Sequence, residues 1–279
     1  MLALRSTADL LTWRTSLAAG TTIAFVPTMG YLHDGHLSLL REARARAGAG
    51  KVVLSIFVNP TQFGPNEDLD RYPRDEAGDF AKAQASGTDV VFCPTTPEEL
   101  YPSRSTWVTV DDLDQHLCGR SRPGHFRGVC TVVCKLLMLV RPDVSLFGQK
   151  DFQQLAILRH MHADLFLPGE IVGMPIVREP DGLALSSRNA NLSAAARQQA
   201  LAISSFLAQV RERFSAGVRD VATLLGDTAS ALAPGKIDYV EVVDALRLAP
   251  VNLIERPALC AVAAFFGGVR LIDNTLLTP

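Results

Sequence analysis

The stretch FVPTMGYLHDGHLSLL, residues 25–40, sets the architecture of the first half of the chain. An apolar, strand-like run ends in Pro-Thr-Met-Gly, and a helix-forming run begins at Asp34–His36. Thr28 and Gly30 are small enough to let the backbone come close to a ligand. The N–H groups and the dipole at the start of the helix favour a phosphate. The stretch therefore predicts a strand, a ligand-binding loop and a helix N-terminus in succession.

Two histidines, His33 and His36, share one face of the first turn of this helix. Each imidazole can donate to phosphate oxygens, and a protonated ring can stabilise charge that grows on a phosphorus centre. Two other interpretations remain open at this point. One is a zinc site, although no third ligand stands at a useful spacing. The other is a pair of helix-capping residues without chemistry.

Strand and helix candidates alternate on both sides of this stretch. The strands are expected over 22–26, 51–59, 88–94 and 144–148, and the helices over 36–47, 77–86, 129–140 and 151–165. This repeated β-α-β spacing predicts an α/β fold with a doubly wound parallel sheet, Rossmann-like, in the N-terminal domain. Three loops that follow strands are PTMGYLHDGH, NPTQFGPNED and GQKD. We expect them to meet at the carboxyl edge of the sheet, where such folds bind ligands.

The pattern changes after about residue 176. Ser193 can cap a helix whose apolar stripe is Ile203, Phe206, Leu207, Val210 and Phe214. Strand-like runs follow over 236–244 and 258–273. We therefore expect two domains, a Rossmann-like domain over 1–176 and a smaller α+β lid domain over 177–279. The link near 174–189 is rich in Pro, Gly and charge.

The bulk composition narrows the class of protein. The formal net charge of the 279 residues is −2, so no global field attracts nucleic acid or an anionic membrane. Five cysteines without a CxxC pair indicate reduced thiols and a cytoplasmic location. Cys130 and Cys134 are expected to be small buried residues rather than one edge of a metal site. The longest apolar region, Val129–Val140, is too short to span a bilayer.

Six blocks in order along nearly the whole chain carry a family resemblance. HDGH resembles the HxGH signature of nucleotidyltransferase-like enzymes, which attack ATP at the α-phosphate. The fuller set resembles the pantothenate synthetase (pantoate–β-alanine ligase) family. Its blocks are PTMGYLHDGHLSLL, SIFVNPTQFGPNEDLDRYPR, RPGHFRGV, FGQKDFQQL, DGLALSSRN and RLIDN.

The resemblance implies an amide-forming ligase of pantothenate biosynthesis. ATP and pantoate would give pantoyl adenylate and pyrophosphate, and β-alanine would then displace AMP. The adenylate supplies a good leaving group, so no protein nucleophile is needed. The resemblance also implies ATP and Mg²⁺, the small-molecule substrates pantoate and β-alanine, and a homodimer. The run 236–244 or a strand region at 107–117 would supply the edge for that dimer.

The resemblance assigns a role to individual residues. His36 would be the proton donor, and His33, Lys150 and Arg188 would complete the catalytic set. The ATP-binding set is Met29, Gly30, His33, His36, Gly148, Lys150, Asp151, Val177, Leu185, Ser186, Ser187 and Arg188. Pantoate would be bound by Gln62, Gln154, Pro27 and Met29, and Mg²⁺ by Asp79.

These residue types suit those roles, and each also has a plainer interpretation. A lysine ammonium, two hydroxyls and a guanidinium suit a polyphosphate. Neutral amides suit a substrate with two hydroxyls and a carboxylate, because they donate and accept. Magnesium typically takes one or two carboxylates plus substrate phosphates. The plainer interpretations are a solvated surface lysine at 150, a helix cap at 186–188 and ordinary glutamines at 62 and 154.

Further segments match the family, with two departures. Tyr72 and the segment GPNEDLDRYPR are expected to form a mobile flap that keeps water from the adenylate. Arg122 and His125 match a segment beside the phosphates, or are simply polar loop residues. Gln149 and Leu185 stand where the family commonly has Glu and Met.

Two alternative functions remain open from the sequence. A related HxGH nucleotidyltransferase would transfer the nucleotide and stop, and it would have no need of the pair Gln62 and Gln154. A catalytically silent nucleotide-binding regulator would have lost its phosphate-handling residues. His33, His36 and Lys150 are all present, as is Arg188, which argues against the regulator.

Overall fold

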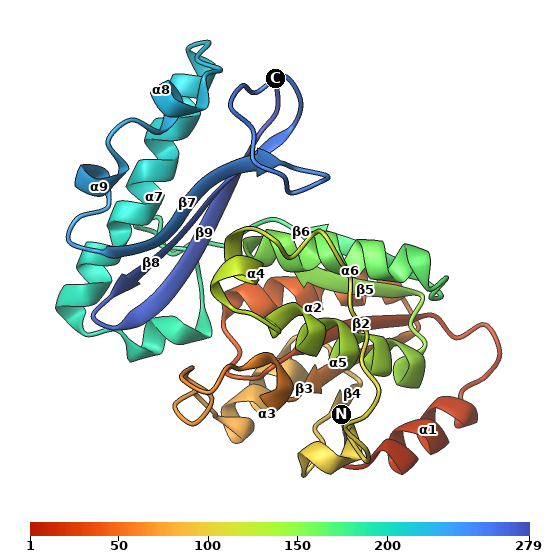
Figure 1. The fold of residues 1–279 in the computed structure, drawn as a ribbon. Coiled ribbons are helices and arrows are strands. Elements are labelled where there is room, and N and C mark those ends of the chain that lie inside the picture. Colours follow the sequence, from red (N-terminus) through yellow and green to blue (C-terminus); the bar gives the residue numbers. More distant parts are fainter. The chain divides into compact units, whose positions relative to one another are not determined.

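In the computed structural model, which describes residues 1–279, the stretch quoted above forms the centre of a parallel sheet. It folds into strand β2 (Ile23–Thr28), a loop, and helix α2 (Asp34–Ala47). The sheet has six parallel strands in the order β1-β4-β3-β2-β5-β6. Helices join the strands, so the predicted α/β class with a doubly wound sheet is confirmed (Figure 1).

The chain divides into two compact units. The first comprises Met1–Val110, Arg122–Gln149 and Ile157–Pro175, and the second comprises Asp111–Ser121, Lys150–Ala156 and Ile176–Pro279. The predicted division after residue 176 differs from these units by residue 176 itself and by the two short segments 111–121 and 150–156. Their membership of the second unit rests on long-range contacts, which leave no periodic signal in the sequence.

The remaining strands of the first unit are β1 (Leu2–Leu4), β3 (Lys51–Ile56), β4 (Val90–Phe92), β5 (Val144–Gly148) and β6 (Glu170–Met174). Its helices are α1 (Thr7–Ser16), α3 (Glu76–Ala85) and α5 (His125–Val140), with α6 (Phe152–Asp164) beginning in the second unit and continuing into the first. Two short 3₁₀ helices are η1 (Pro60–Gln62) and η2 (Pro97–Glu99). Strands β1 and β6 escaped the sequence analysis because both are short and neither shows a clear alternation.

The strand order places one crevice at the carboxyl edge of this sheet. From β2 the chain runs outward through β3 to β4, and after α5 it returns to β5 on the other side of β2. Right-handed crossovers then put α5 on the face opposite α2 and α3. The adjacent strands β2 and β5 end at Thr28 and Gly148. Open α/β sheets bind ligands at the point where the strand order changes direction, which here lies between the ends of β2 and β5.

One apolar core fixes the position of α2 and α3 on this sheet. Leu40, Ala43 and Ala83 pack with Val26 and Leu54, and all five side chains are fully buried. Side chains recur on one face every 3.6 residues in a helix and every second residue in a strand. Apolar residues at these spacings therefore give each element one apolar face, and these faces pack together. The loop between β2 and α2 is therefore held at both ends by buried elements.

The second unit is built on a smaller antiparallel sheet in the order β7-β8-β9. Its strands are β7 (Lys236–Asp244), β8 (Ala258–Phe266) and β9 (Val269–Leu277). Its α-helices are α4 (Leu117–Ser121), α7 (Ala194–Ser215), α8 (Val221–Leu225) and α9 (Thr228–Ala231). Its 3₁₀ helices are η3 (Gln149–Asp151) and η4 (Ser187–Asn191), and the first residue of η3 is the last residue of a segment of the first unit. Ser193 caps α7 as predicted, and the predicted stripe on α7 is buried against the sheet.

Several expectations need correction in detail. The region 107–117 forms no strand and so supplies no sheet edge; β7 does lie at the edge of the small sheet. The run 258–273 is a hairpin of two strands, because Gly267 and Gly268 turn the chain with φ of +56° and +82°. None of the five cysteines forms a disulfide; on α5, Cys130 is buried as expected and Cys134 is half-buried. None of the helices combines the length and apolarity needed to cross a bilayer.

Candidate active site

His33 and His36 cap the helix that follows the central strand. The Nδ1 atom of His33 accepts a hydrogen bond from Gly35 N at 3.2 Å, and Nδ1 of His36 accepts one from His33 N at 3.4 Å. The two ring centroids lie 4.1 Å apart. These bonds form a capping box, in which histidines take the places that a Ser/Thr and a Glu/Gln usually occupy. The two histidines therefore do cap the helix, which was one of the interpretations left open by the sequence.

The capping bonds also fix the tautomer of both rings. A ring nitrogen that accepts a backbone N–H carries no proton itself, so a neutral His33 or His36 is protonated at Nε2. Each ring then presents an N–H donor at the end of the helix where backbone N–H groups and the dipole already favour anions. Capping and phosphate binding are therefore compatible, because they use different nitrogens of the same ring.

The loop between β2 and α2 is held by the carboxylate of Asp79. Its Oδ2 accepts from Tyr31 N at 2.7 Å, and its Oδ1 accepts from Leu32 N at 2.6 Å. Lys82, one turn further along α3, donates from Nζ to Leu32 O at 2.8 Å. Gly30 has φ of +83°, and a Cβ there would lie 2.9 Å from Asp79 Oδ2. Only glycine fits this position, so the approach of α3 to the loop explains the glycine that ends Pro-Thr-Met-Gly.

This geometry bears on the predicted magnesium ligand. The Asp79 side chain is 1% exposed, and each of its oxygens already accepts a backbone N–H. Burial raises the pKa of Asp79, and the bonds from Leu32 and Tyr31 partly offset that effect. Magnesium demands a near-octahedral shell and usually keeps several waters. No group of three or more His, Cys, Asp or Glu side chains suited to a metal ion is present. The metal assignment of Asp79 stays a prediction, which this geometry does not favour.

The side-chain amide of Gln62 is oriented by a buried network. Asn59 Nδ2 donates to Gln62 Oε1 at 3.1 Å. Asn59 Oδ1 accepts from Tyr101 Oη at 3.0 Å and from Thr61 Oγ1 at 2.9 Å, which fixes the orientation of the Asn59 amide. Gln62 Nε2 then lies 3.3 Å from the sulfur of Met29. The network therefore turns the donor end of Gln62 towards the loop that carries Met29.

A second group holds the backbone of Gln62. Its carbonyl oxygen lies 2.8 Å from His125 Nδ1 and accepts from Arg122 Nη2 at 3.3 Å. Arg122 also forms two bonds with Glu67, at 2.8 and 2.5 Å. Burial raises the pKa of Glu67, but the hydrogen bonds and charge of Arg122, the Gly64 N–H and the charge of His125 together outweigh burial, so the pKa lies below its ordinary value. Within this unit, Arg122 and His125 act as supports for Gln62.

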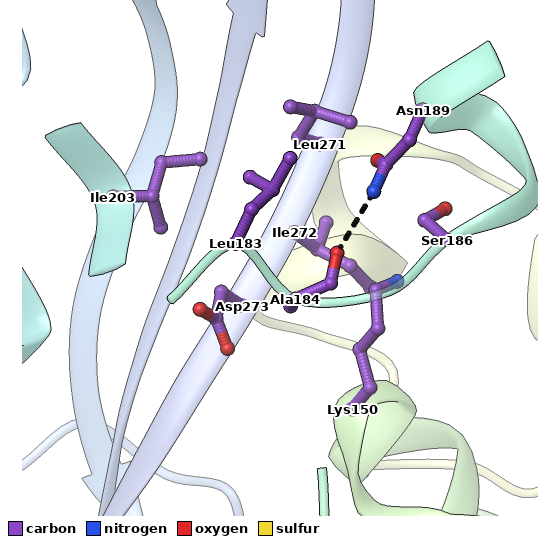
Figure 2. A pocket seen from close by; sticks show the side chains of 9 residues that line it. All are labelled: Lys150, Leu183, Ala184, Ser186, Asn189, Ile203, Leu271, Ile272 and Asp273. Atoms are coloured by element: carbon purple, nitrogen blue, oxygen red, sulfur yellow. Dashed lines mark hydrogen bonds between the residues drawn. The ribbon is translucent and has the colours of Figure 1, made fainter. Parts of the chain in front are cut away.

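In the second unit, Lys150 and Ser186 line one cavity (Figure 2). The cavity is small, about 10 Å³, which is room for a single water at most. Lys150 lies on η3, and its side chain extends towards the segment that carries Ala184 and Ser186. The structure thus brings together two residues that are 36 positions apart in the sequence and that were both predicted to bind phosphate.

The other predicted residues of the second unit lie on the same few segments. Asp151 is exposed at the end of η3, and Gln154 follows on the first turn of α6. Val177 and Leu185 pair across a short hairpin, with Leu185 N donating to Val177 O at 3.0 Å. Ser186 caps η4 by accepting from Arg188 N at 3.3 Å. Ser187 is buried, and Arg188 is half-buried.

In the first unit, Pro27 and Gly148 lie at the carboxyl ends of β2 and β5. The structure brings Met29 and Gln62 together, as described above. Tyr72, expected on a mobile flap, has 6% exposure and packs edge-on against Phe63 with ring centroids 6.0 Å apart. The tip of that segment, Pro65–Asn66, is exposed.

Asn59 and Tyr101 orient Gln62, although no motif in the sequence assigned them a role. Asn59 stands directly before Pro60 in the loop that follows β3, which is a signal for a side chain that bonds the turn. Tyr101 is far away in the sequence, and no local pattern links it to Gln62. The polar pair Asp273 and Asn274 lies on strand β9, and only the family motif RLIDN pointed to it.

A parallel sheet whose central strand is followed by a helix that begins within the sequence HDGH is typical of the HxGH class of α/β enzymes. The family model for pantoate-beta-alanine ligase matches residues 3–276. The pantothenate synthetase of Anaeromyxobacter dehalogenans is 58% identical over 263 residues, covering 92% of this chain and 91% of the relative. That of Myxococcus xanthus is 52% identical over 280 residues, covering 98% and 95%. The chain belongs to the pantoate-beta-alanine ligase family.

Solved structures agree with this membership. The crystal structure of pantothenate synthetase from Thermus thermophilus matches with a TM-score of 0.93 at 44% identity, over 100% of both chains. Pantoate-beta-alanine ligase from Francisella tularensis, complexed with beta-gamma ATP and beta-alanine, matches with a TM-score of 0.83 at 33% identity. That match covers 99% of this chain and 97% of the other. The predicted fold class and family are confirmed.

The first prediction concerns the Asp79 carboxylate. Asp79→Asn replaces one oxygen by an NH₂ group that faces a backbone N–H, so a buried donor is left unpaired. We expect the free energy of unfolding in urea to fall by about 1–3 kcal/mol. Asp70→Asn, on an exposed residue, is the matched control and should leave it unchanged.

The same measurement separates the two roles of Asp79. A loop-holding role predicts the same loss of stability with and without millimolar Mg²⁺. A loss that appears only when Mg²⁺ is present would instead make Asp79 a metal ligand.

Proposed function

We propose that this chain joins pantoate to β-alanine in two ATP-dependent steps. In the first, a pantoate carboxylate oxygen attacks the α-phosphorus of ATP, and the bond from that phosphorus to pyrophosphate breaks. In the second, the amine of β-alanine attacks the acyl carbon of pantoyl adenylate, and the acyl–oxygen bond to AMP breaks. The products are pantothenate, AMP and pyrophosphate. Family membership over residues 3–276 supports this reaction.

The observation that carries the proposal is the histidine pair at the start of α2. Two Nε2–H donors and a helix N-terminus stand beyond the carboxyl end of the central strand. Charge develops on the phosphate oxygens during the first step, and fixed donors stabilise it without reorganising. We assign proton donation to His36 and phosphate binding to His33. Met29 and Gly30 would contribute backbone, and Gly148 the neighbouring strand end.

The second unit would supply the remaining nucleotide contacts. Lys150, Ser186, Ser187 and Arg188 offer an ammonium, two hydroxyls and a guanidinium, which suit phosphate oxygens. Asp151, Val177 and Leu185 would contact the ribose and the base. The proposal also assigns 177–279 the role of a lid. Mg²⁺, the homodimer and the cytoplasmic location stay predictions from the family resemblance.

Pantoate would be bound chiefly by Gln62 and Gln154, next to Pro27 and Met29. The fixed donor end of Gln62 suits the pantoate carboxylate or a hydroxyl oxygen. A nucleotidyltransferase that releases its product after the first step has no use for an amide held in this way. The network around Gln62 therefore favours the ligase over that alternative.

The direct test is to assay the two half-reactions separately. We expect ATP, pantoate and Mg²⁺ to release pyrophosphate, and added β-alanine to give pantothenate and AMP in equal amounts. Pyrophosphate without amide would indicate the nucleotidyltransferase. ATP binding without either product would indicate the regulator.

A second test addresses His36. The variant His36→Gln keeps a side-chain acceptor for the capping bond, since Gln is a usual residue at this position. Unlike an imidazole, a glutamine amide cannot act as a general acid, so the rate of pyrophosphate release should fall by about 10²–10⁴-fold. His160→Gln, on an exposed histidine of α6, is the control and should keep the wild-type rate. A His36→Gln enzyme with wild-type turnover would remove His36 from the mechanism.

A third test addresses the orientation of Gln62. Asn59→Asp is isosteric but has no donor, so the new carboxylate would repel Gln62 Oε1 and draw its NH₂ group instead. The substrate would lose one donor, and the KM for pantoate should rise about 10- to 100-fold. Tyr101→Phe is the milder comparison, because Thr61 still fixes the Asn59 amide. A pantoate KM within twofold of wild type in Asn59→Asp would contradict the orienting network.

A further inference from the structure

The segment that precedes Ser186 is a short hairpin. Its two arms pair through Leu185 N to Val177 O at 3.0 Å and Glu179 N to Leu183 O at 2.8 Å. Gly182 makes the turn with φ of +96°. The hairpin runs directly into η4, which carries Ser186–Arg188. Any shift of the hairpin would therefore move the proposed phosphate-binding segment.

An ion pair between the half-buried Arg178 and the buried Asp273 fixes this hairpin to strand β9. Arg178 Nη1 lies 2.6 Å from Asp273 Oδ2, and Nη2 lies 2.9 Å from Oδ1. The same guanidinium donates to Gly182 O at 3.0 Å, so it also braces the turn. Asp273 is 4% exposed. A bidentate pair fixes both distance and angle, which a single bond does not.

The next residue on β9 holds the other phosphate-binding segment. Asn274 Nδ2 donates to the backbone carbonyl of Lys150 at 2.9 Å, and the side chain is 7% exposed. Consecutive residues of a strand point to opposite faces. One strand therefore holds the 177–185 hairpin from one face, through Asp273, and the backbone of Lys150 from the other, through Asn274.

Packing alone does not explain polar residues at these places. The neighbouring strand β8 reads ALCAVAAFF and is almost wholly buried with apolar side chains. Burying an Asp and an Asn costs free energy unless each is bonded. Here both are bonded to segments that carry proposed ATP ligands. Lys150, Ser186 and Asp273 line the same cavity, which is the point where the three segments meet (Figure 2).

We infer that Asp273 and Asn274 are positioning residues that set the spacing between Lys150 and the Ser186–Arg188 segment. The inference rests on the proposed function, since it concerns the grip on the triphosphate. It predicts a selective defect. Adenylate formation needs the ammonium and the hydroxyls at a fixed distance, and a displacement of about 1 Å can cost about 10²-fold in rate. Amide formation starts after pyrophosphate has left, so it depends less on this spacing.

The test compares the two half-reactions in Asp273→Asn and Asn274→Leu. The first is the release of pyrophosphate from ATP and pantoate, and the second is amide formation from prepared pantoyl adenylate and β-alanine. We expect the first rate to fall about 10- to 100-fold and the second to change less than threefold. A merely structural role would lower both rates together, in proportion to the folded fraction.

Two further variants sharpen the comparison. Thr275→Val removes a buried polar group from the next position of β9 and should leave both rates within twofold of wild type. The double variant Arg178→Gln/Asp273→Asn should release pyrophosphate at a rate no lower than that of the less active single variant, because both residues act through one ion pair. That result would not follow from two independent losses of stability.

Several results would overturn the inference. They are an unchanged first step in both single variants, an equal loss in both steps, or fully additive effects of Arg178→Gln and Asp273→Asn. A wild-type chain that releases no pyrophosphate from ATP and pantoate would instead overturn the proposed function, so the two failures are distinguishable.

Discussion

The first unit depends on one carboxylate that accepts two backbone N–H groups. Asp79 lies on α3 and holds the loop at Tyr31 and Leu32. That loop sets where α2 starts and which way His33 and His36 face. A capping box made of Ser and Glu would stabilise the helix equally well but would present no imidazole. The histidines satisfy two backbone donors through Nδ1 and so keep an N–H on Nε2, which can donate a hydrogen bond to a phosphate oxygen.

Buried amides and ion pairs recur as orienting devices in both units. In the first, Asn59 turns Gln62 so that its NH₂ group faces Met29. In the second, Arg178 and Asp273 fix the hairpin before Ser186. Each device places a flexible polar group on a rigid element, which lowers the entropy cost of holding a substrate. Their burial also makes them costly to break, because a lone partner would be left unsatisfied.

The class of fold and the family follow from the sequence without any coordinates. Short apolar runs predict β2, β5 and β7, and an apolar stripe of period 3.6 predicts α7, all close to their observed bounds, because local burial patterns follow local geometry. Six ordered motifs are enough to indicate the family, and they include the segments around His33, Lys150 and Ser186. These are properties of contiguous residues, and a chain carries them whatever its long-range contacts.

What several of these residues do depends instead on contacts between remote segments. Asp79 has the residue type of a metal ligand, but its position under the loop gives both oxygens to backbone N–H groups. Asn59 and Tyr101 meet across 42 positions, and Arg178 and Asp273 across 95. The physical reason is the same in each case. A hydrogen bond depends on distances of about 3 Å between atoms, and neither residue type nor spacing along the chain encodes such a distance between remote segments.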